Sequence, residues 1–173
     1  MKREYHVIGL MSGTSLDGLD IAYCKFNLEN DCWHFEIEKA VTIEYNSSWR
    51  GQLAVADGLS GNDLWRLHVQ LGHYFGKLVK EFVIQNRIKV DFVCSSGHTI
   101  FHRPELGYTA QIGDGSSIAA ECRIDTICDF RSMDVAYGGQ GAPLVPVGDK
   151  LLFSSYDYCL NIGGISNISF DHQ

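Results

Sequence analysis

Residues 9–20, GLMSGTSLDGLD, place small residues, hydroxyls and carboxylates between two apolar segments. Those segments, 4–10 and 19–26, are rich in Val, Ile, Leu and aromatic residues, which favours two strands. A hairpin needs only a short turn, so chain reversal alone does not explain this loop. Glycines and hydroxyl residues let successive N–H groups face one concavity, which is an arrangement that binds anions. The stretch therefore predicts a phosphate-binding loop, with a loose hairpin of turn-forming residues as the alternative.

The two carboxylates of this stretch refine the expected ligand. Asp17 and Asp20 would repel a bare phosphate, but they suit a phosphate that carries Mg²⁺, which oxygen ligands or their bound waters hold. The loop lacks the Gly-Lys-Ser/Thr end of a Walker motif, and it does not open a helix as G-x-G-x-x-G does. A magnesium nucleoside triphosphate is the expected ligand.

Periodicity along the rest of the chain predicts an α/β domain with a mixed sheet. Apolar and polar residues alternate over 33–45, which indicates a third strand after the turn at 27–32. Residues 60–85 carry apolar side chains at spacings of three and four, which predicts a long helix that starts with a capping box at Ser60 and Asp63. Gly72 and Gly76 lie one turn apart on it, where another element could approach closely.

After this helix the predicted elements alternate. Strands are expected at 90–96, 108–113 and 124–130, a short helix at 114–122, and a further helix from about 147. Residues 98–107 and 131–146 are interpreted as loops. His68 and His73 belong to the long helix and are interpreted as structural. Strands that alternate with helices after an all-strand beginning define the class as α/β.

Composition restricts the possible partners. At 173 residues and 45% hydrophobic content, the chain is long enough to bury a core. A net charge of −7 without a basic block argues against nucleic acid or an anionic membrane as the main partner. No apolar stretch approaches the length of a membrane span, and no secretory leader is evident, so a cytoplasmic location is expected. Six cysteines without a C-x-x-C pair are expected to be reduced and mostly buried.

The last residues repeat the plan of the first. YCLNIGGISNISF, like YHVIGLMSGTSLDGLDIAY, reads as an apolar strand, Ile-Gly, a small-residue loop and a second strand. If the first copy opens a domain at 1–157, the second opens another at 158–173 that is cut off soon after it begins. A natural end on an outgoing strand would expose an unpaired edge, so we expect the chain to be part of a longer protein.

Four stretches carry a family resemblance. MSGTSLDGLDIA, QIGDG, DFRSMDVAYGGQGAPLVP and LNIGGISNISF are similar, in order and spacing, to the anhydro-N-acetylmuramic acid kinases, members of the sugar kinase, heat-shock chaperone ATPase and actin superfamily. The resemblance runs through all 173 residues and covers about the first half of a typical member. It implies the first of two ribonuclease-H-like domains around a nucleotide cleft.

The resemblance also implies an activity. Such a kinase would use ATP, Mg²⁺ and water to open the 1,6-anhydro ring of anhydro-N-acetylmuramic acid and phosphorylate the freed O6, which recycles cell-wall sugar. The general base of this family is an aspartate in a Phe-Asp-x-Gly-Pro-Gly-Asn-like motif expected beyond Gln173, so we assign no catalytic residue here. The partners would be the two small molecules, and a homodimer is compatible with the sequence. A non-catalytic nucleotide-binding or regulatory domain of the same fold is the main alternative, and a ribonuclease-H-like nuclease is a weaker one.

Two loops would contact the nucleotide. The first loop is expected to contribute Gly13, Thr14, Ser15, Leu16, Asp17, Gly18, Leu19 and Asp20, with Asp17 also holding Mg²⁺ through water. The second is expected to contribute Gly163, Gly164, Ser166 and Asn167.

Four further residues are candidates for binding the sugar. Gln111 and Asp114 could hydrogen-bond sugar hydroxyls, or Asp114 could simply cap the next helix. Arg131 and Asp134 match positions that are charged in the family, but Arg131 could equally form a structural ion pair with Asp129 or Asp134.

The segment 95–99 departs from the family pattern. It reads Ser-Ser-Gly-His-Thr where the family has Ser-His-Gly-x-Thr, so a sugar contact from Ser96 is in doubt. His98 and His102 invite interpretation as metal ligands. Four residues of extended chain span about 13 Å, too far for the two to share one ion.

Overall fold

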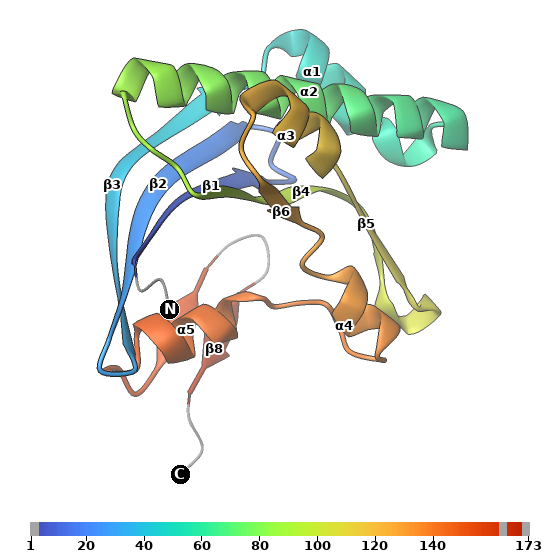
Figure 1. The fold of residues 1–173 in the computed structure, drawn as a ribbon. Helices are drawn as coiled ribbons and strands as arrows, with labels where there is room; N and C mark the ends of the chain where they lie inside the picture. Colours follow the sequence, from blue (N-terminus) through green and yellow to red (C-terminus); the bar gives the residue numbers. More distant parts are fainter. Residues whose placement is uncertain (1–3, 163–165, 171–173) are drawn as a thin grey trace.

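A six-stranded mixed sheet forms the centre of the protein (Figure 1). The structure is a computed structural model, and it describes residues 4–162 and 166–170. The strand order is β3-β2-β1-β4-β5, with β6 also paired to β4. The strands are β1 Glu4–Ser12, β2 Gly18–Glu29, β3 Cys32–Glu44, β4 Phe92–Arg103, β5 Tyr108–Ile112 and β6 Thr126–Cys128. β2 is antiparallel to β1 and β3, whereas β4 is parallel to β1 and β6, which confirms the predicted mixed α/β class.

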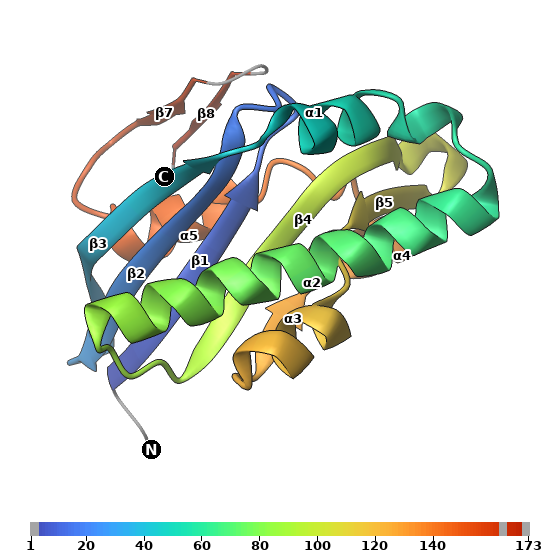
Figure 2. The same cartoon turned by 90° about the horizontal axis from the view of Figure 1, so that it is seen from above.

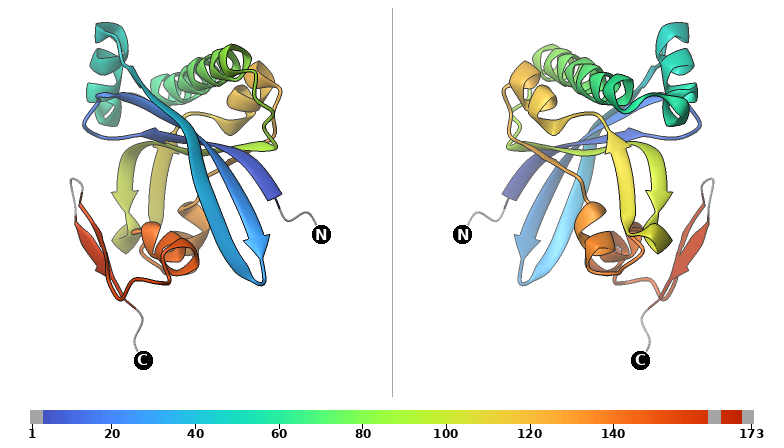
Figure 3. Two further views of the ribbon diagram at one scale, coloured as in Figure 1. Left: turned by 90° about the vertical axis from the view of Figure 1, so that its left-hand side faces the viewer. Right: turned by 90° about the vertical axis from the view of Figure 1, so that its right-hand side faces the viewer.

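Helices lie on both sides of this sheet. α2 (Gly61–Asn86) crosses one face diagonally, with α1 (Ser47–Ala54) and α3 (Gly115–Cys122) on the same side (Figure 2). On the other side lie α4 (Ser132–Ala136), α5 (Val145–Leu152) and a separate two-stranded hairpin (Figure 3). The hairpin consists of β7 (Cys159–Asn161) and β8 (Asn167–Ser169). Short 3₁₀ turns occupy Ala56–Gly58 and Pro104–Leu106.

The main core lies between the sheet and α2. Leu71, Phe75 and Val79 of the helix are fully buried and pack against strand residues such as Ile8 and Ile21. The helix begins as the sequence predicts, because the Ser60 hydroxyl accepts a hydrogen bond from the Asp63 N–H at 3.1 Å and donates to the Asp63 carboxylate at 2.7 Å.

Gly72 and Gly76 allow α3 to lie directly against α2. A Cβ at Gly72 would be 2.5 Å from the Asp114 carbonyl oxygen, and one at Gly76 would be 2.7 Å from that of Ile118. The close approach that their spacing predicts is therefore confirmed. His73 adds a hydrogen bond from its Nδ1 to Glu121 of α3 at 2.9 Å, which is consistent with a structural role.

Several expectations for the secondary structure are wrong. β4 does not end at residue 96 but continues to Arg103, because residues 98–103 pair with β5 where the sequence suggested a loop. α1 was not anticipated, and α4 lies within the stretch 131–146 that was interpreted as a loop. Both helices are short, and α1 is only weakly amphipathic, so neither produces a periodic pattern long enough to recognise. β6 is three residues long instead of seven.

The prediction of mostly buried cysteines is also wrong. All six cysteines are free thiols, but Cys32 and Cys128 are exposed and the other four are only partly buried. Cys94 lines a pocket with residues of α5, whereas Cys128 lies beside Gly115 of α3. Burial raises the pKa of the Cys94 thiol, so this group is less reactive than an exposed thiol.

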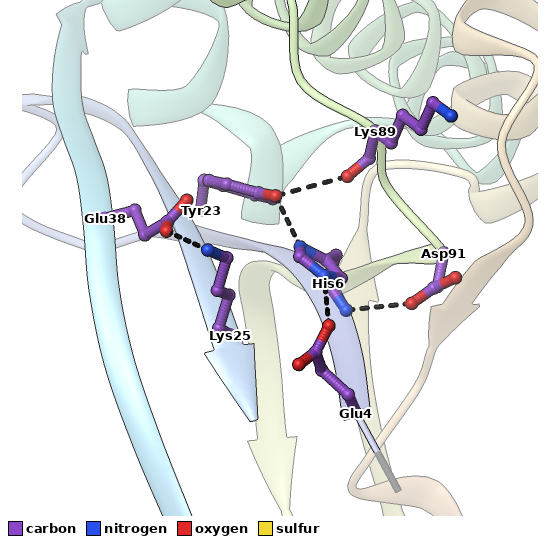
Figure 4. Close-up of polar contacts among 7 residues, drawn as sticks. All are labelled: Glu4, His6, Tyr23, Lys25, Glu38, Lys89 and Asp91. Atoms are coloured by element: carbon purple, nitrogen blue, oxygen red, sulfur yellow. Dashed lines mark hydrogen bonds and ion pairs between the residues drawn. The ribbon is translucent and has the colours of Figure 1, made fainter. Parts of the chain in front are cut away.

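A polar cluster links β1 and β2 to the segment that leads into β4 (Figure 4). The Tyr23 hydroxyl donates to the Lys89 carbonyl at 3.3 Å and lies 2.6 Å from Nδ1 of His6. The His6 backbone N–H donates to the Asp91 carboxylate at 2.8 Å, and its Nε2 lies 3.0 Å from Glu4. The Tyr23 side chain therefore connects β2 with β1 and with the segment before β4, while the residue is only 3% exposed.

We expect Tyr23→Phe to lower the free energy of unfolding by about 1–3 kcal/mol, because it leaves two partly buried groups without their partner. Urea unfolding of both proteins measures this difference. A matched control is Tyr74→Phe, since no described residue hydrogen-bonds the Tyr74 hydroxyl; a loss as large in the control would contradict the prediction.

Candidate functional site

The predicted phosphate loop is a short connection of residues 13–17 between β1 and β2. The Leu16 N–H donates to the Gly13 carbonyl at 3.2 Å, which closes a turn with Leu16 in the left-handed region at φ 60°. Thr14, Ser15 and Asp17 are exposed. The N–H groups of Thr14 and Ser15 have no hydrogen-bond partner among residues 4–162 and 166–170. Adjacent free donors beside two hydroxyls can bind an anion.

The glycines at the two ends of the loop have different surroundings. A Cβ at Gly13 would lie 3.3 Å from the Ser15 hydroxyl and 4.0 Å from the Ser15 nitrogen, over the free donors. A Cβ at Gly18 would lie 2.4 Å from the Ile43 carbonyl oxygen, so β3 requires glycine there. Absence of a side chain keeps the loop open at Gly13 and permits strand packing at Gly18.

The remaining predicted residues of this motif belong to β2. Leu19 is fully buried in the core, and its side chain therefore cannot face a ligand at the loop. The Asp20 carboxylate is exposed and accepts a hydrogen bond from the Thr42 hydroxyl of β3. The structure thus brings residues 13–17 together at the loop and gives Leu19 a packing role.

The second predicted loop lies in the β7–β8 hairpin. Gly163 and Gly164 fall outside the described residues. Ser166 is exposed, and Asn167 begins β8, where its side-chain oxygen accepts from Asn161 at 3.1 Å. β7 and β8 are antiparallel, so they repeat the strand, loop and antiparallel strand plan of β1 and β2. The role of this hairpin as the opening of another domain stays a prediction.

Asp114 caps α3. Its carboxylate accepts hydrogen bonds from the Ser117 N–H at 2.8 Å and the Ser117 hydroxyl at 2.6 Å. Desolvation would raise the pKa of this carboxyl, but the bonds from Ser117 and the Ser116 N–H prevail and hold it below its ordinary value. Nearby, His68 accepts from the Gly113 N–H at its Nδ1, and burial lowers the pKa of its imidazole. Capping explains Asp114 without a ligand.

We expect Asp114→Ala to cost about 0.5–2 kcal/mol of stability at neutral pH. The carboxyl has a lower pKa when folded than when unfolded, so its contribution is complete above the ordinary aspartate value near 3.9 and is lost as the pH falls below it. Urea unfolding at pH 7 and pH 3 should show a smaller difference between wild type and variant at pH 3.

Asn46→Ala is the matched control for this pH dependence. Asn46 caps α1 by accepting from the Trp49 N–H at 2.9 Å, and its amide does not titrate. Asn46→Ala should lower the free energy of unfolding by the same amount at pH 7 and pH 3. If the stability lost in Asp114→Ala is the same at both pH values, the assigned role of the Asp114 carboxylate is contradicted.

Gln111 lies on β5 and belongs to a row of polar groups. Its amide donates to the Thr109 hydroxyl at 2.8 Å, and Nδ1 of His102 lies 3.1 Å from the same hydroxyl. His102 is therefore bonded to β5, whereas His98 is buried against β1. Among the described residues, no group of three or more His, Cys, Asp or Glu side chains is arranged to hold a metal ion.

Arg131 and Asp134 both bind the backbone of Gly141. The Arg131 guanidinium donates to the Gly141 carbonyl at 2.7 Å, and the Asp134 carboxylate accepts from the Gly141 N–H at 2.7 Å. Asp134 also lies so close to Gly139 that a Cβ there would be 2.2 Å from the carboxylate oxygen. The two charged side chains thus fix the glycine-rich segment 138–141, a role that differs from the ion pair the sequence suggested.

Sequence reasoning considered His98 only as a metal ligand and did not connect it with the residues behind the loop. Ser12, Tyr45 and His98 form a buried hydrogen-bonded set in which the Ser12 hydroxyl contacts Tyr45 at 2.6 Å and His98 at 2.9 Å. Ser12 precedes Gly13 directly, and this adjacency was the one available signal. The other two residues come from distant parts of the chain.

The sheet order and the parallel β1–β4 pair define a ribonuclease-H-like α/β domain, in which an open loop follows β1. Comparison with known families identifies it further: a profile described as anhydro-N-acetylmuramic acid kinase matches residues 5–171. The chain therefore belongs to the anhydro-N-acetylmuramic acid kinase family.

Curated relatives agree with this assignment. Proteins named anhydro-N-acetylmuramic acid kinase are 38% identical in Pseudoalteromonas translucida, 39% in Vibrio vulnificus and 40% in a Picosynechococcus species. The matches cover 98%, 95% and 95% of this chain, but 47%, 46% and 45% of those relatives. The chain thus spans about half the length of the curated relatives it matches. Within the described residues, no helix is both long and apolar enough to cross a membrane.

Proposed function

We propose that this chain forms the nucleotide-binding half of an ATP-dependent anhydro-N-acetylmuramic acid kinase. The complete enzyme would hydrolyse the 1,6-anhydro bond and transfer the γ-phosphoryl group of ATP to the freed O6, giving N-acetylmuramic acid 6-phosphate. The observation that carries this proposal is the loop 13–17, in which the Thr14 and Ser15 N–H groups have no partner among the described residues and a glycine leaves them accessible. Family membership supplies the substrate class.

The residues of this chain would bind and orient the nucleotide. The free N–H groups and the hydroxyls of Thr14 and Ser15 are donors for phosphate oxygens, as phosphoryl transfer requires. Mg²⁺, when bound with ATP, would neutralise phosphate charge, and the exposed carboxylate of Asp17 fits a contact to it through water. Gly163, Gly164, Ser166 and Asn167 would form the facing loop.

The sugar would lie on the side of β5 and α4. Gln111 offers an amide there. Asp114 would act mainly by capping α3, and Arg131 and Asp134 by fixing the backbone at Gly141. The water-activating aspartate would come from the second half of the enzyme. The supply of ATP places this reaction in the cytoplasm.

The test uses the complete enzyme, in which this chain precedes the second half found in its relatives. With magnesium ATP and anhydro-N-acetylmuramic acid, mass spectrometry should detect the 6-phosphate sugar and an equal amount of ADP. ATP binding without a sugar phosphate would instead support the non-catalytic, regulatory alternative. Absence of ATP binding by calorimetry would refute both.

A further inference from the structure

The phosphate loop is attached at both ends to one buried tyrosine. Tyr45 directly follows β3, and its hydroxyl lies 2.6 Å from the Ser12 hydroxyl, at the residue that enters the loop. The Tyr45 backbone N–H donates to the carbonyl of Asp17, the residue that leaves the loop, at 3.1 Å. Because the side chain of Tyr45 is only 2% exposed, these attachments are shielded from water.

His98 completes the attachment from β4. Its Nδ1 lies 2.9 Å from the Ser12 hydroxyl, and the residue is 3% exposed. A β-bulge brings it there: Leu10 pairs with Ser95, but Ser12 pairs with His98, so β4 contains one extra residue. Gly97 accommodates the bulge at φ 66°, where a Cβ would lie 2.9 Å from Gln111. Such bulges often redirect side chains near functional sites.

The hydrogens shared between these three side chains can be assigned consistently. A serine hydroxyl donates once and accepts from others, so Tyr45 can donate to Ser12 while Ser12 donates to His98. Burial raises the pKa of Tyr45 to about 12, despite the opposing hydrogen bond to Ser12, so the phenol keeps its proton. Burial lowers the pKa of His98 against an opposing hydrogen bond with the Ser12 backbone, and the lowered pKa favours the neutral imidazole that can accept. The Ser12 hydroxyl is therefore occupied internally and is not a phosphate ligand.

We propose that Tyr45 and His98 are positioning residues for nucleotide binding, which act through Ser12 to hold the backbone of residues 13–17 in the conformation that a phosphate requires. This inference rests on the proposed function, because it assumes that the loop binds ATP. Neither side chain touches the nucleotide. Their effect is to prepare the loop, so that binding does not have to order it.

The test compares Tyr45→Phe and Ser12→Ala with the wild type in the complete enzyme. We expect KM for ATP to rise at least about tenfold in each variant, since small misplacements of binding groups have large effects. KM for the sugar should stay within about twofold. The matched control is Tyr23→Phe, which removes another buried tyrosine hydroxyl from the same sheet, far from the loop. It should lower the melting temperature without changing KM for ATP.

His98 is tested by rescue. His98→Asn keeps a polar group near the position of Nδ1, whereas His98→Leu removes it, so the asparagine variant should retain more ATP affinity. If the wild type is active and every variant binds ATP as tightly as the wild type does, this inference is overturned and the proposed kinase function remains intact. A wild-type enzyme that binds no ATP would overturn both. If Tyr45→Phe does not fold, the ATP affinities of Ser12→Ala, His98→Asn and His98→Leu test the inference instead.

Discussion

Gly13→Val in the complete enzyme should weaken ATP binding by at least about tenfold, or about 1.4 kcal/mol, with little change in stability. A side chain at this position would lie over the Ser15 N–H and hydroxyl, where a phosphate oxygen must approach. Among the described residues, the flexible Ser15 side chain alone lies within 3.4 Å of the new Cβ, so folding should tolerate the substitution. Isothermal calorimetry measures the affinity, and thermal unfolding measures the stability.

Two other glycines provide controls for this result. Gly58→Val adds the same bulk at a position with open space around it, and neither ATP affinity nor stability should change appreciably. Gly18→Ala, in contrast to Gly13→Val, should lower the stability of the fold. Its new Cβ would meet the backbone of Ile43, which cannot move without shifting β3. Unchanged ATP affinity in a folded Gly13→Val protein would remove residues 13–17 from the nucleotide site.

Residues 1–173 assayed by themselves should show no ATP-dependent conversion of anhydro-N-acetylmuramic acid. Phosphoryl transfer depends on positioning and electrostatic stabilisation, which the proposed two-domain cleft would supply from both sides, and this chain spans about half of its curated relatives. If the water-activating aspartate lies in the second half, as proposed, its absence should alone remove roughly 10²–10⁴-fold of the rate. The assay follows formation of the 6-phosphate sugar with purified protein and magnesium ATP.

The complete enzyme is the positive control for this experiment. It should form product under the same conditions, and a complete enzyme in which the expected aspartate of the second half is replaced by Asn should not. Turnover by residues 1–173 at a rate comparable to that of the complete enzyme would show that the catalytic residues lie within this chain. The assignment of the base to the second half would then be wrong.

The sequence predicted those parts of the fold that depend on local pattern. The alternation over 33–45 and the apolar spacing over 60–85 correspond to β3 and α2, because each is long enough to repeat its period several times. Gly72 and Gly76 indicated a close contact, although not that α3 makes it. The continuation of β4 to Arg103 was not predictable, since it depends on pairing with β5.

The local part of the candidate site, the loop itself, was also predictable from the sequence. The glycine and hydroxyl content of 13–17 indicated a loop that could bind an anion, and the structure leaves its donors free. Composition could not reveal that Ser12, one residue earlier, turns its hydroxyl inward, because its partners Tyr45 and His98 are 33 and 86 residues away. Long-range hydrogen bonds of this kind leave no periodic trace in a single sequence.

The parallel pairing of β1 with β4 has a consequence for the order of folding. β1, β2 and β3 are joined by short connections, whereas Val7 of β1 and its partner Phe92 of β4 are separated by about 85 residues, so closing that loop is entropically costly. We expect the three-strand meander to form early and β4 to dock late. Because docking of β4 brings His98 to Ser12, the chain would acquire its finished phosphate loop near the end of folding. Pulse-labelling hydrogen exchange would then show the amides of β2 and β3 protected before those of β4.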